Sequence, residues 1–439
     1  MSIDPVTAGW LGIAAIGILV VLGVRVAFAA AAVGLVGLIW MRGWQVGTGI
    51  AGVIPHAESV HFSLSVLPMF ILIGYMAYYA GITRGLYDAG TKWLSRIPGG
   101  LGVGSVFACA GFAAVSGAST ASAAVFARIA IPEMLRAGYD RRLAAASVAA
   151  AGTLASLIPP SAILVIYGII VEESVGRLLL AGFIPGVISA VMYAVVIIVR
   201  VMISPELAPP VTSRFTLREK VVALKGTSGV LLVVGIIMGG IYLGWMTPTE
   251  TGAVGAAVIF VMALAKREMT ARNFVDSLME TGKLTAMIFT IIYSILIFVR
   301  FLGYSGLPQE FAAWVVGLDV PRVAIFISIL AIYFVLGMFL DGIGMLMLTL
   351  PVVYPAVLKL GYDPIWFGVI IVKLVEICLV TPPVGLNCYV VNGVRPDIPL
   401  SDIFKGVWPF VVADLIVIAF LYVFPDVVTF LPNTMFGKG

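Results

Sequence analysis

The chain has 439 residues, of which 61% are hydrophobic and only 11% are charged, with a formal net charge of +4. In soluble domains about a quarter of the residues are charged. A soluble protein of this length could not bury so much apolar surface. We therefore predict an all-α polytopic membrane protein, and the small net charge gives no reason to expect a nucleic-acid partner. Three cysteines in apolar segments, without paired or zinc-type spacing, predict neither a disulfide framework nor a transition-metal site.

Ten apolar stretches are long enough to cross the bilayer, which takes about 20 residues per helix. The first stretch lacks a basic n-region and a small-residue cleavage site, so we interpret it as a retained span. In chain order the stretches cover residues 6–23, 26–43, 65–82, 143–171, 179–203, 227–245, 250–265, 284–302, 364–393 and 406–425. Two further stretches, at about 101–135 and 323–358, are too long for one helix. Their polar, glycine-rich middles predict re-entrant helical hairpins.

Pairs of prolines interrupt two of the predicted spans, in LIPPSAILVIYG at residues 157–168 and in LVTPPVGLNC at residues 379–388. Proline removes a backbone donor and clashes with the preceding helical turn. In lipid the freed carbonyl groups would cost several kcal/mol each, so such a break is tolerated only where it lines a cavity or is buried in protein. There, freed carbonyls coordinate cations and half-helix N-termini face anions. A simple packing kink is the alternative for either pair.

The second half of the chain echoes the first. A shift of 223 residues places Gly-Tyr-Asp at 138–140 on Gly-Tyr-Asp at 361–363, and the first proline pair on the second. Chance similarity between apolar segments is the alternative, but a fixed offset is the mark of duplication. We predict repeats at residues 1–203 and 227–439, joined by a cytoplasmic linker at 204–226. Each repeat has three spans, a hairpin, a broken span and a final span, and its five crossings invert the second copy, as in secondary transporters.

The distribution of lysine and arginine supports this layout. Cytoplasmic loops of membrane proteins are enriched in these residues. When the 204–226 loop is placed in the cytoplasm and both hairpins are re-entrant, 18 lysines and arginines fall inside and 6 outside. The layout predicts that both termini lie in the periplasm. A hairpin that crossed fully would weaken this bias.

The first hairpin tip and the first break form one candidate sodium site. Small residues at the tip let backbones approach closely, and serine and threonine hydroxyls are hard oxygen ligands that suit Na⁺. Tight helix packing by small residues is the alternative interpretation. The candidate residues are Ser116, Gly117, Ser119, Thr120, Pro159, Pro160 and Ser161.

The second tip and the second break form the other candidate sodium site. Asp341 is an intramembrane carboxylate and hence a functional candidate, although it suits a helix cap equally well. Asn387 offers an amide and a carbonyl to a cation or to a substrate carboxylate, which we expect between the two tips, close to Ser119. The candidate residues of this site are Asp341, Gly342, Gly344, Thr381, Pro382 and Gly385.

Other charged residues in apolar segments allow two interpretations each. Lys373 and Glu376 stand at i and i+3 on one helix, and we expect them to pair. Alternatively, Lys373 attracts an anionic substrate. Arg128, within the first hairpin, suits a side chain that snorkels to the cytoplasmic interface.

Motifs for chemistry are missing from the sequence. It has no phosphate-binding GxxxxGK[ST] loop, no HExxH motif and no nucleophilic triad pattern, so we predict that the protein is not an enzyme and has no cofactor other than Na⁺ as a coupling ion. His56 and His61 flank Glu58 in the first periplasmic loop. This group predicts a solvated loop, with a metal site as the alternative.

Taken together, the segments VSGASTASAA, LIPPSAILVIYG, FLDGIGMLML, LVTPPVGLN and GVWPF resemble the large membrane subunit of tripartite ATP-independent periplasmic (TRAP) transporters, of the four-carbon-dicarboxylate type. The resemblance runs over nearly the whole chain. It implies an elevator-type carrier in a bacterial or archaeal inner membrane, which imports an organic acid with a sodium gradient. It also implies two partners, a small four-span membrane subunit and a periplasmic substrate-binding protein.

Three other functions stay open at this stage. A related stand-alone sodium-coupled dicarboxylate carrier would need no binding protein. A membrane-embedded enzyme or assembly scaffold would need a polar catalytic cluster, which the sequence does not show. A channel would conduct without sodium coupling.

Overall fold

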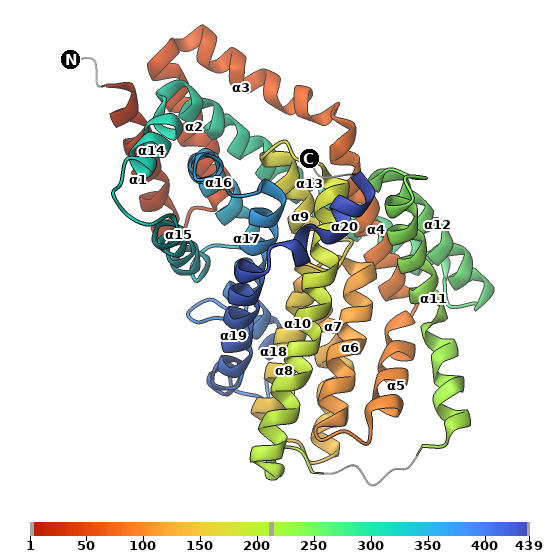
Figure 1. Cartoon of the computed structure of the whole chain (residues 1–439). Helices are drawn as coiled ribbons and strands as arrows, with labels where there is room; N and C mark the ends of the chain where they lie inside the picture. Colours follow the sequence, from red (N-terminus) through yellow and green to blue (C-terminus); the bar gives the residue numbers. More distant parts are fainter. Residues whose placement is uncertain (1–3, 210–214, 437–439) are drawn as a thin grey trace.

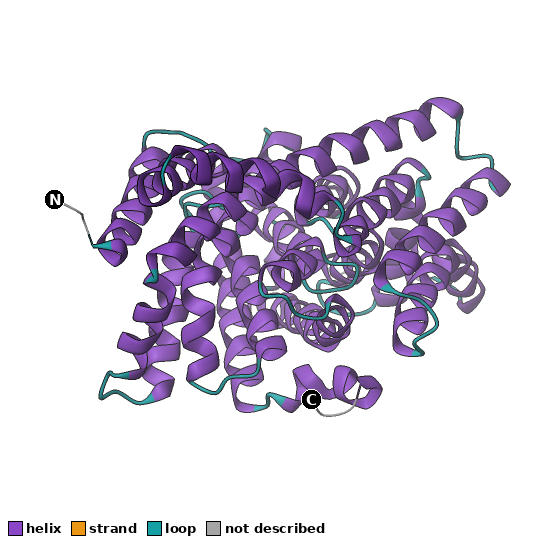
Figure 2. Cartoon of the chain, turned by 90° about the horizontal axis from the view of Figure 1, so that it is seen from above, coloured by secondary structure: helices purple, strands orange, loops and turns teal. Residues whose placement is uncertain are grey.

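The computed structural model describes residues 4–209 and 215–436, and all regular structure in these ranges is helical, which confirms the predicted fold class (Figure 1). Figure 2 shows the same helices from above, joined by short loops. Two predictions concern residues outside the described ranges: Arg214 in the predicted linker, and the periplasmic location of the two chain ends.

In the first half the helices are α1 (Pro5–Val21), α2 (Val26–Arg42), α3 (Trp44–Ser59), α4 (Val66–Tyr79), α5 (Ile82–Leu94), α6 (Gly100–Ser116), α7 (Ser119–Arg136), α8 (Arg141–Thr153), α9 (Ala162–Ile170) and α10 (Val175–Ile203), with 3-10 turns η1 (Phe62–Ser65), η2 (Leu154–Ser156) and η3 (Pro205–Leu207).

From its hairpin onward, the second half of the chain has the same order of α-helices as the first, α15 to α19 after α6 to α10. A shift of 223 residues carries the bounds of α7 onto those of α16, and the first residue of α8 onto the first residue of α17. Its helices are α11 (Leu217–Tyr242), α12 (Pro248–Ala265), α13 (Ala271–Ser305), α14 (Leu307–Val316), α15 (Arg322–Gly337), α16 (Gly342–Lys359), α17 (Pro364–Cys378), α18 (Leu386–Val394), α19 (Leu400–Val423) and α20 (Asp426–Phe436).

Both predicted hairpins consist of two helices joined by a short tip, α6 with α7 and α15 with α16. Both predicted broken spans stop at the proline pairs, between α8 and α9 and between α17 and α18. The Pro159–Pro160 and Pro382–Pro383 peptide bonds are both cis. Proline cannot donate to a helix ladder, so the chain leaves the helix at these points and starts a new one.

The repeated Gly-Tyr-Asp tripeptide has a local structural role. Gly138 and Gly361 follow α7 and α16 with φ of +83° and +80°, a left-handed conformation that glycine adopts without strain. Two residues later, Asp140 and Asp363 cap α8 and α17, where their carboxylates accept backbone N–H groups of the first turn. The tripeptide therefore ends the hairpin and begins the broken helix in both halves.

The two halves of the chain interlock around the breaks. α9, from the first half, packs against α16 of the second hairpin. α18, from the second half, packs against α7 of the first hairpin and against α8. Each hairpin is therefore covered partly by a half-helix from the other half of the chain.

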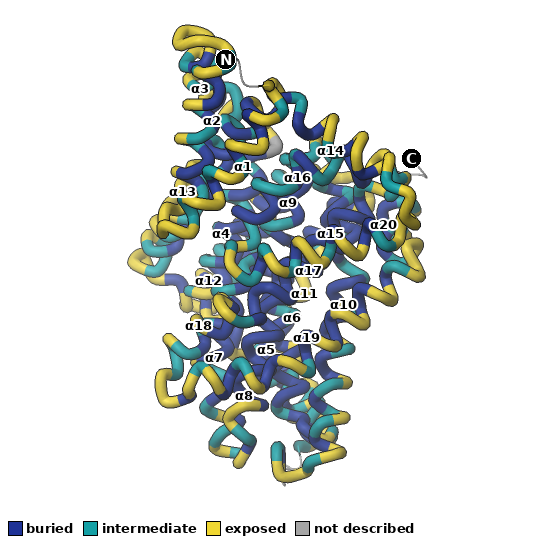
Figure 3. The backbone as a smooth tube through the Cα atoms, turned by 90° about the vertical axis from the view of Figure 1, so that its left-hand side faces the viewer, coloured by how far each residue is buried: buried dark blue, intermediate teal, exposed yellow. Residues whose placement is uncertain are grey.

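Six helices in the described residues are long and apolar enough to cross a membrane, α10, α11, α12, α13, α16 and α19, or seven if the bent pair of α4 and α5 counts as one span. Buried positions fill the centre of the protein, while exposed ones follow the outer helices (Figure 3). On α10 a stripe of valines with four-residue spacing is 42–47% exposed; it consists of Val187, Val191, Val195 and Val199. An exposed apolar stripe of this length indicates contact with lipid.

Several helices differ from the sequence-based expectation. The predicted first periplasmic loop contains the helix α3. Its polar residues make it amphipathic, so its sequence does not predict a membrane span. Taken alone, α5, α14 and α20 are likewise too short to span a membrane. α11 begins at Leu217, within the predicted linker, because Thr216 and Glu219 form a capping box at its start.

Candidate functional site

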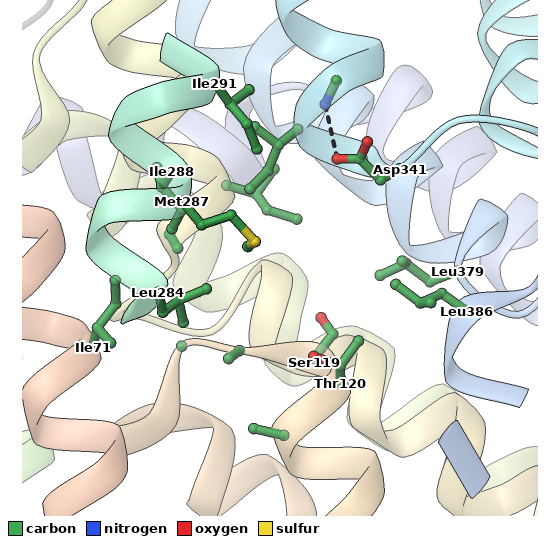
Figure 4. A pocket seen from close by; sticks show the side chains of 18 of the residues that line it. Ile71, Ser119, Thr120, Leu284, Met287, Ile288, Ile291, Asp341, Leu379 and Leu386 are labelled. Carbon is green, nitrogen blue, oxygen red and sulfur yellow. Dashed lines mark hydrogen bonds between the residues drawn. The ribbon is translucent and has the colours of Figure 1, made fainter. Parts of the chain in front are cut away.

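The two hairpin tips face one cavity of about 930 Å³ (Figure 4). Residues 116–121 of the first tip and residues 339–344 of the second tip both line it. Such a volume is typical of sites for small organic molecules, which have about 300–1,000 Å³. Another wall comes from α13, through Leu284, Met287, Ile288 and Ile291.

The first tip is held by hydroxyl pairs. Ser119 Oγ lies 2.7 Å from Ser156 Oγ in the first break, and Ser116 Oγ lies 3.0 Å from Ser122 Oγ on α7. Ser119 and Thr120 also line the cavity, at the start of α7. Two of the hydroxyls predicted for the first site are therefore paired with other serines, at the tip and at the start of α7.

The first break meets this tip directly. Gly117, with φ of +60°, ends α6, and a Cβ atom there would collide with the carbonyl oxygen of Pro160. Among the described residues, no N–H or O–H group donates a hydrogen bond to that oxygen. Ser161 accepts a hydrogen bond from the backbone of Leu164 at 3.2 Å and so caps α9. The break thus leaves one carbonyl without a partner beside the tip, as the proline pair predicts.

At the second tip, Asp341 caps α16 and also lines the cavity. Its Oδ2 accepts a hydrogen bond from the backbone N–H of Gly344 at 3.0 Å, which is the dashed line in Figure 4. Gly342 packs so closely on α17 that a Cβ atom there would lie 2.5 Å from Val375 Cγ1. The predicted cap is confirmed, and the carboxylate remains exposed toward the cavity.

The second break is tied to the second tip through the backbone, since Val384 N–H donates to Met338 O at 3.3 Å. Gly385, with φ of +49°, opens α18. Thr381 directs its hydroxyl back to Ile377 O at 2.6 Å and is fully buried. Thr381, one of the oxygen ligands predicted for the second sodium site, therefore offers the cavity no free hydroxyl.

Asn387 does not line the cavity, and it connects the two halves of the chain. Its amide donates a hydrogen bond to Ala149 O on α8 at 3.2 Å. Its carbonyl oxygen is buried and has no hydrogen-bond partner in the described residues. A role for Asn387 in binding substrate or cation stays a prediction.

The predicted pair of Lys373 and Glu376 is present and belongs to a larger cluster. Lys373 Nζ lies 2.6 Å from Glu376 Oε2 and 2.7 Å from Asp414 Oδ1 on α19. The hydroxyl of Tyr193 on α10 donates to Asp414 Oδ2 at 2.7 Å. All four side chains are fully buried, and none lines the cavity described above.

Two arginines add positive charge to the cavity. Arg25, at the start of α2, and Arg128, on α7, both line it and are exposed. No carboxylate of the described chain lies within 4 Å of either guanidinium. Within residues 4–209 and 215–436, the cavity therefore offers two cations that no carboxylate neutralises.

The predicted histidine group is split between two elements. His56 lies in α3, whereas His61 precedes η1. Glu58 and His61 line a second cavity of about 1,010 Å³, together with Glu173 and other residues. In residues 4–209 and 215–436, no group of three histidine, cysteine, aspartate or glutamate side chains is arranged to hold a metal ion.

Sequence reasoning missed three residues of these arrangements. Ser156 carries no signal that separates it from the other small residues of its span. Asp414 does, because it is an intramembrane carboxylate in the predicted span 406–425, and the rule that selected Asp341 applies equally to it. Tyr193 becomes recognisable only once α10 is placed beside α19.

Comparison with known proteins gives consistent matches. Residues 13–427 match the family model described as "Tripartite ATP-independent periplasmic transporter, DctM component". The chain is 35% identical over 376 residues to a C4-dicarboxylate TRAP transporter large permease protein of Pseudomonas aeruginosa, with 85% of this chain and 87% of that protein covered. It is 31% identical to a sialic acid TRAP transporter large permease protein of Vibrio cholerae, over 98% of both chains.

A solved structure shares the fold. The crystal structure of the YdaH transporter of Alcanivorax borkumensis matches with a TM-score of 0.59 over 88% of this chain and 90% of that one. The sequence identity between the two is 13%, so this likeness concerns the arrangement of helices alone.

Proposed function

Because the chain belongs to the family of the DctM component of tripartite ATP-independent periplasmic transporters, we propose that it is the membrane permease of a sodium-driven carrier that imports an organic acid. Its relatives are named for dicarboxylates, sialic acid and 2,3-diketo-L-gulonate, which are all organic anions. A small membrane subunit and a periplasmic binding protein complete the carrier.

One observation carries this proposal: both hairpin tips and two arginines that have no carboxylate partner in the described residues surround the same cavity. Helix N-termini and guanidinium groups attract carboxylates. Tip hydroxyls and the free Pro160 carbonyl are oxygen ligands for Na⁺ at the first site, and the Asp341 carboxylate is one at the second. Sodium bound at the tips would then complete a pocket for the anion between them.

In the proposed cycle, the moving part of the protein slides across the bilayer with sodium and the organic anion bound. The moving part contains both hairpins and both broken helices, in two inverted repeats. The interlocking of α9 with α16 and of α18 with α7 supports a body that moves as one unit. Rigid movement past a fixed scaffold is one form of alternating access.

Uptake by purified components in proteoliposomes tests the function. We expect accumulation of an organic anion only with an inward sodium gradient, and only when the small subunit and the binding protein are present. Uptake by this chain alone would instead support the stand-alone carrier. Conduction that does not depend on sodium would overturn both.

Substitutions at the tips test the sodium sites within the same assay. Ser119→Ala removes a tip hydroxyl and Asp341→Ala removes the carboxylate, so each should raise the sodium concentration needed for half-maximal uptake several-fold. Ser328→Ala, an exposed serine on α15, is the matched control. Unchanged sodium dependence in both tip variants would contradict the assigned sites.

The same proposal places both termini in the periplasm of a bacterial or archaeal cell. The excess of lysine and arginine in the loops on the opposite side supports this orientation. A C-terminal alkaline phosphatase fusion should therefore be active in cells. An inactive fusion, together with a fluorescent cytoplasmic reporter at the same position, would reverse the topology.

A further inference from the structure

The buried cluster of Lys373, Glu376 and Asp414 contains one positive and two negative side chains. None of the three is exposed to solvent. In the described residues no second lysine or arginine lies within 4 Å of either carboxylate. If both carboxylates were ionised, the cluster would have a net charge of −1 in an apolar interior, which is strongly unfavourable.

We propose that this cluster is a proton-binding site in which Glu376 holds one proton and thereby makes the cluster neutral. The geometry distinguishes the two carboxylates. Asp414 Oδ1 lies 2.7 Å from the Lys373 ammonium, in an ion contact without hydrogen-bond geometry, and Asp414 Oδ2 accepts a hydrogen bond from the Tyr193 hydroxyl. Glu376 has Lys373 at Oε2, whereas its Oε1 is buried with neither a hydrogen-bond donor nor a cation beside it in the described residues. An ionised oxygen with neither a donor nor a cation is the costlier arrangement, so the proton belongs on Glu376.

Few other titratable groups face the cluster. Tyr193 on α10 contacts it, through the hydrogen bond to Asp414 and with the centre of its ring 5.4 Å from Lys373 Nζ. Tyr333 on α15 and Tyr167 on α9 belong to helices that pack against α17, but in the described residues neither hydroxyl bonds a cluster residue. The thiol of Cys378 lies at the end of α17, near the backbone of α15. The balance of charge is therefore set by Lys373, Glu376 and Asp414.

The proton site connects the two breaks. The Tyr193 hydroxyl lies 3.2 Å from Thr153 Oγ1, at the last residue of α8 before the first break. Glu376 is close to the end of α17, and its neighbour Val375 touches Gly342 of the second tip. A charge that appears on Glu376 would therefore act on both broken helices, next to both proposed sodium sites.

Infrared spectroscopy of the purified protein tests the proton directly, without any transport measurement. We expect the C=O stretching band of a neutral carboxylic acid at pH 7, with a shift in D₂O. The band should disappear in Glu376→Gln. It should also disappear in Asp414→Asn, because Lys373 then pairs with one ionised carboxylate. Asp402→Asn is the matched control, since Asp402 already pairs with Arg141 and Arg142. No band in the wild type, or a band that survives both cluster substitutions, overturns the proposal.

The pH profile of uptake gives a second readout, which rests on the proposed function. Wild-type uptake should fall as alkaline pH removes the proton. Glu376→Gln should keep its uptake over the same range, because its side chain has no proton to lose. If Glu376 had a purely structural role, the pH profile of uptake would have the same shape in Glu376→Gln as in the wild type. If uptake fails altogether while the infrared band behaves as expected, the proposed function is at fault and the proton site stands.

Discussion

Replacing Gly117 with alanine should abolish sodium-driven uptake or raise the sodium requirement at least about tenfold. Gly117 has φ of +60°, where an L-residue costs about 1–2 kcal/mol. Its new Cβ would also collide with the Pro160 carbonyl oxygen, which is backbone and has little freedom to move. The tip would have to withdraw from the break, and the proposed sodium ligands would separate. A loss of about 1.4 kcal/mol in binding free energy corresponds to a tenfold weaker affinity.

The control for this prediction is Gly239→Ala on α11, where an added Cβ atom meets nothing within 4 Å. Both variants should be purified in the same amount, and sodium titrations of uptake should be compared. A normal titration for Gly117→Ala would show that the tip and the break do not form a site together. A loss of uptake in both variants would show that the assay reports only a general sensitivity to glycine replacement.

Replacing Lys373 with methionine should be among the most destabilising single substitutions in the protein. It leaves Glu376 and Asp414 buried without their cation, and breaking a buried ion pair in this way costs about 3–5 kcal/mol. The thermal unfolding midpoint in detergent should fall sharply. Fluorescence-detected size-exclusion chromatography over a range of temperatures measures it.

The partner residues provide a test of the cause. Combining Lys373→Met with Glu376→Gln and Asp414→Asn removes the cation and both carboxyl groups, so no buried charge is left unpaired and most of the lost stability should return. An exposed pair gives the contrast: Lys283→Met, which breaks the contact with Glu280 on α13, should change the midpoint little. A Lys373→Met variant as stable as the wild type would mean that the carboxylates are neutral without the lysine.

The sequence allowed the interrupted helices to be predicted because proline acts locally. Two adjacent prolines cannot continue a helix in any surroundings, so both breaks were found where they were expected, in each half. The Gly-Tyr-Asp tripeptide is equally local, since it combines a helix end with a helix cap. The capping box at Thr216 belongs to the same class, and it marks a helix start that hydropathy alone assigns to the linker.

Other features depended on contacts between distant segments. The pairing of Lys373 with Glu376 follows from their spacing on one helix, but Asp414 joins them from α19. The contact of Ser119 with Ser156 spans the tip and the break, and it requires the folded chain. Helices α3, α14 and α20 escaped prediction because they are short and amphipathic, and a search for long apolar segments cannot detect them.

The exchange of half-helices between the two halves of the chain bears on how such a chain arose. In a polypeptide with a single repeat, α7 would have no α18 beside it, and the tip of its hairpin would be left open on one flank. If the two halves arose by duplication of one ancestral segment, two copies of that segment would have covered each other's flanks before they were joined in one chain.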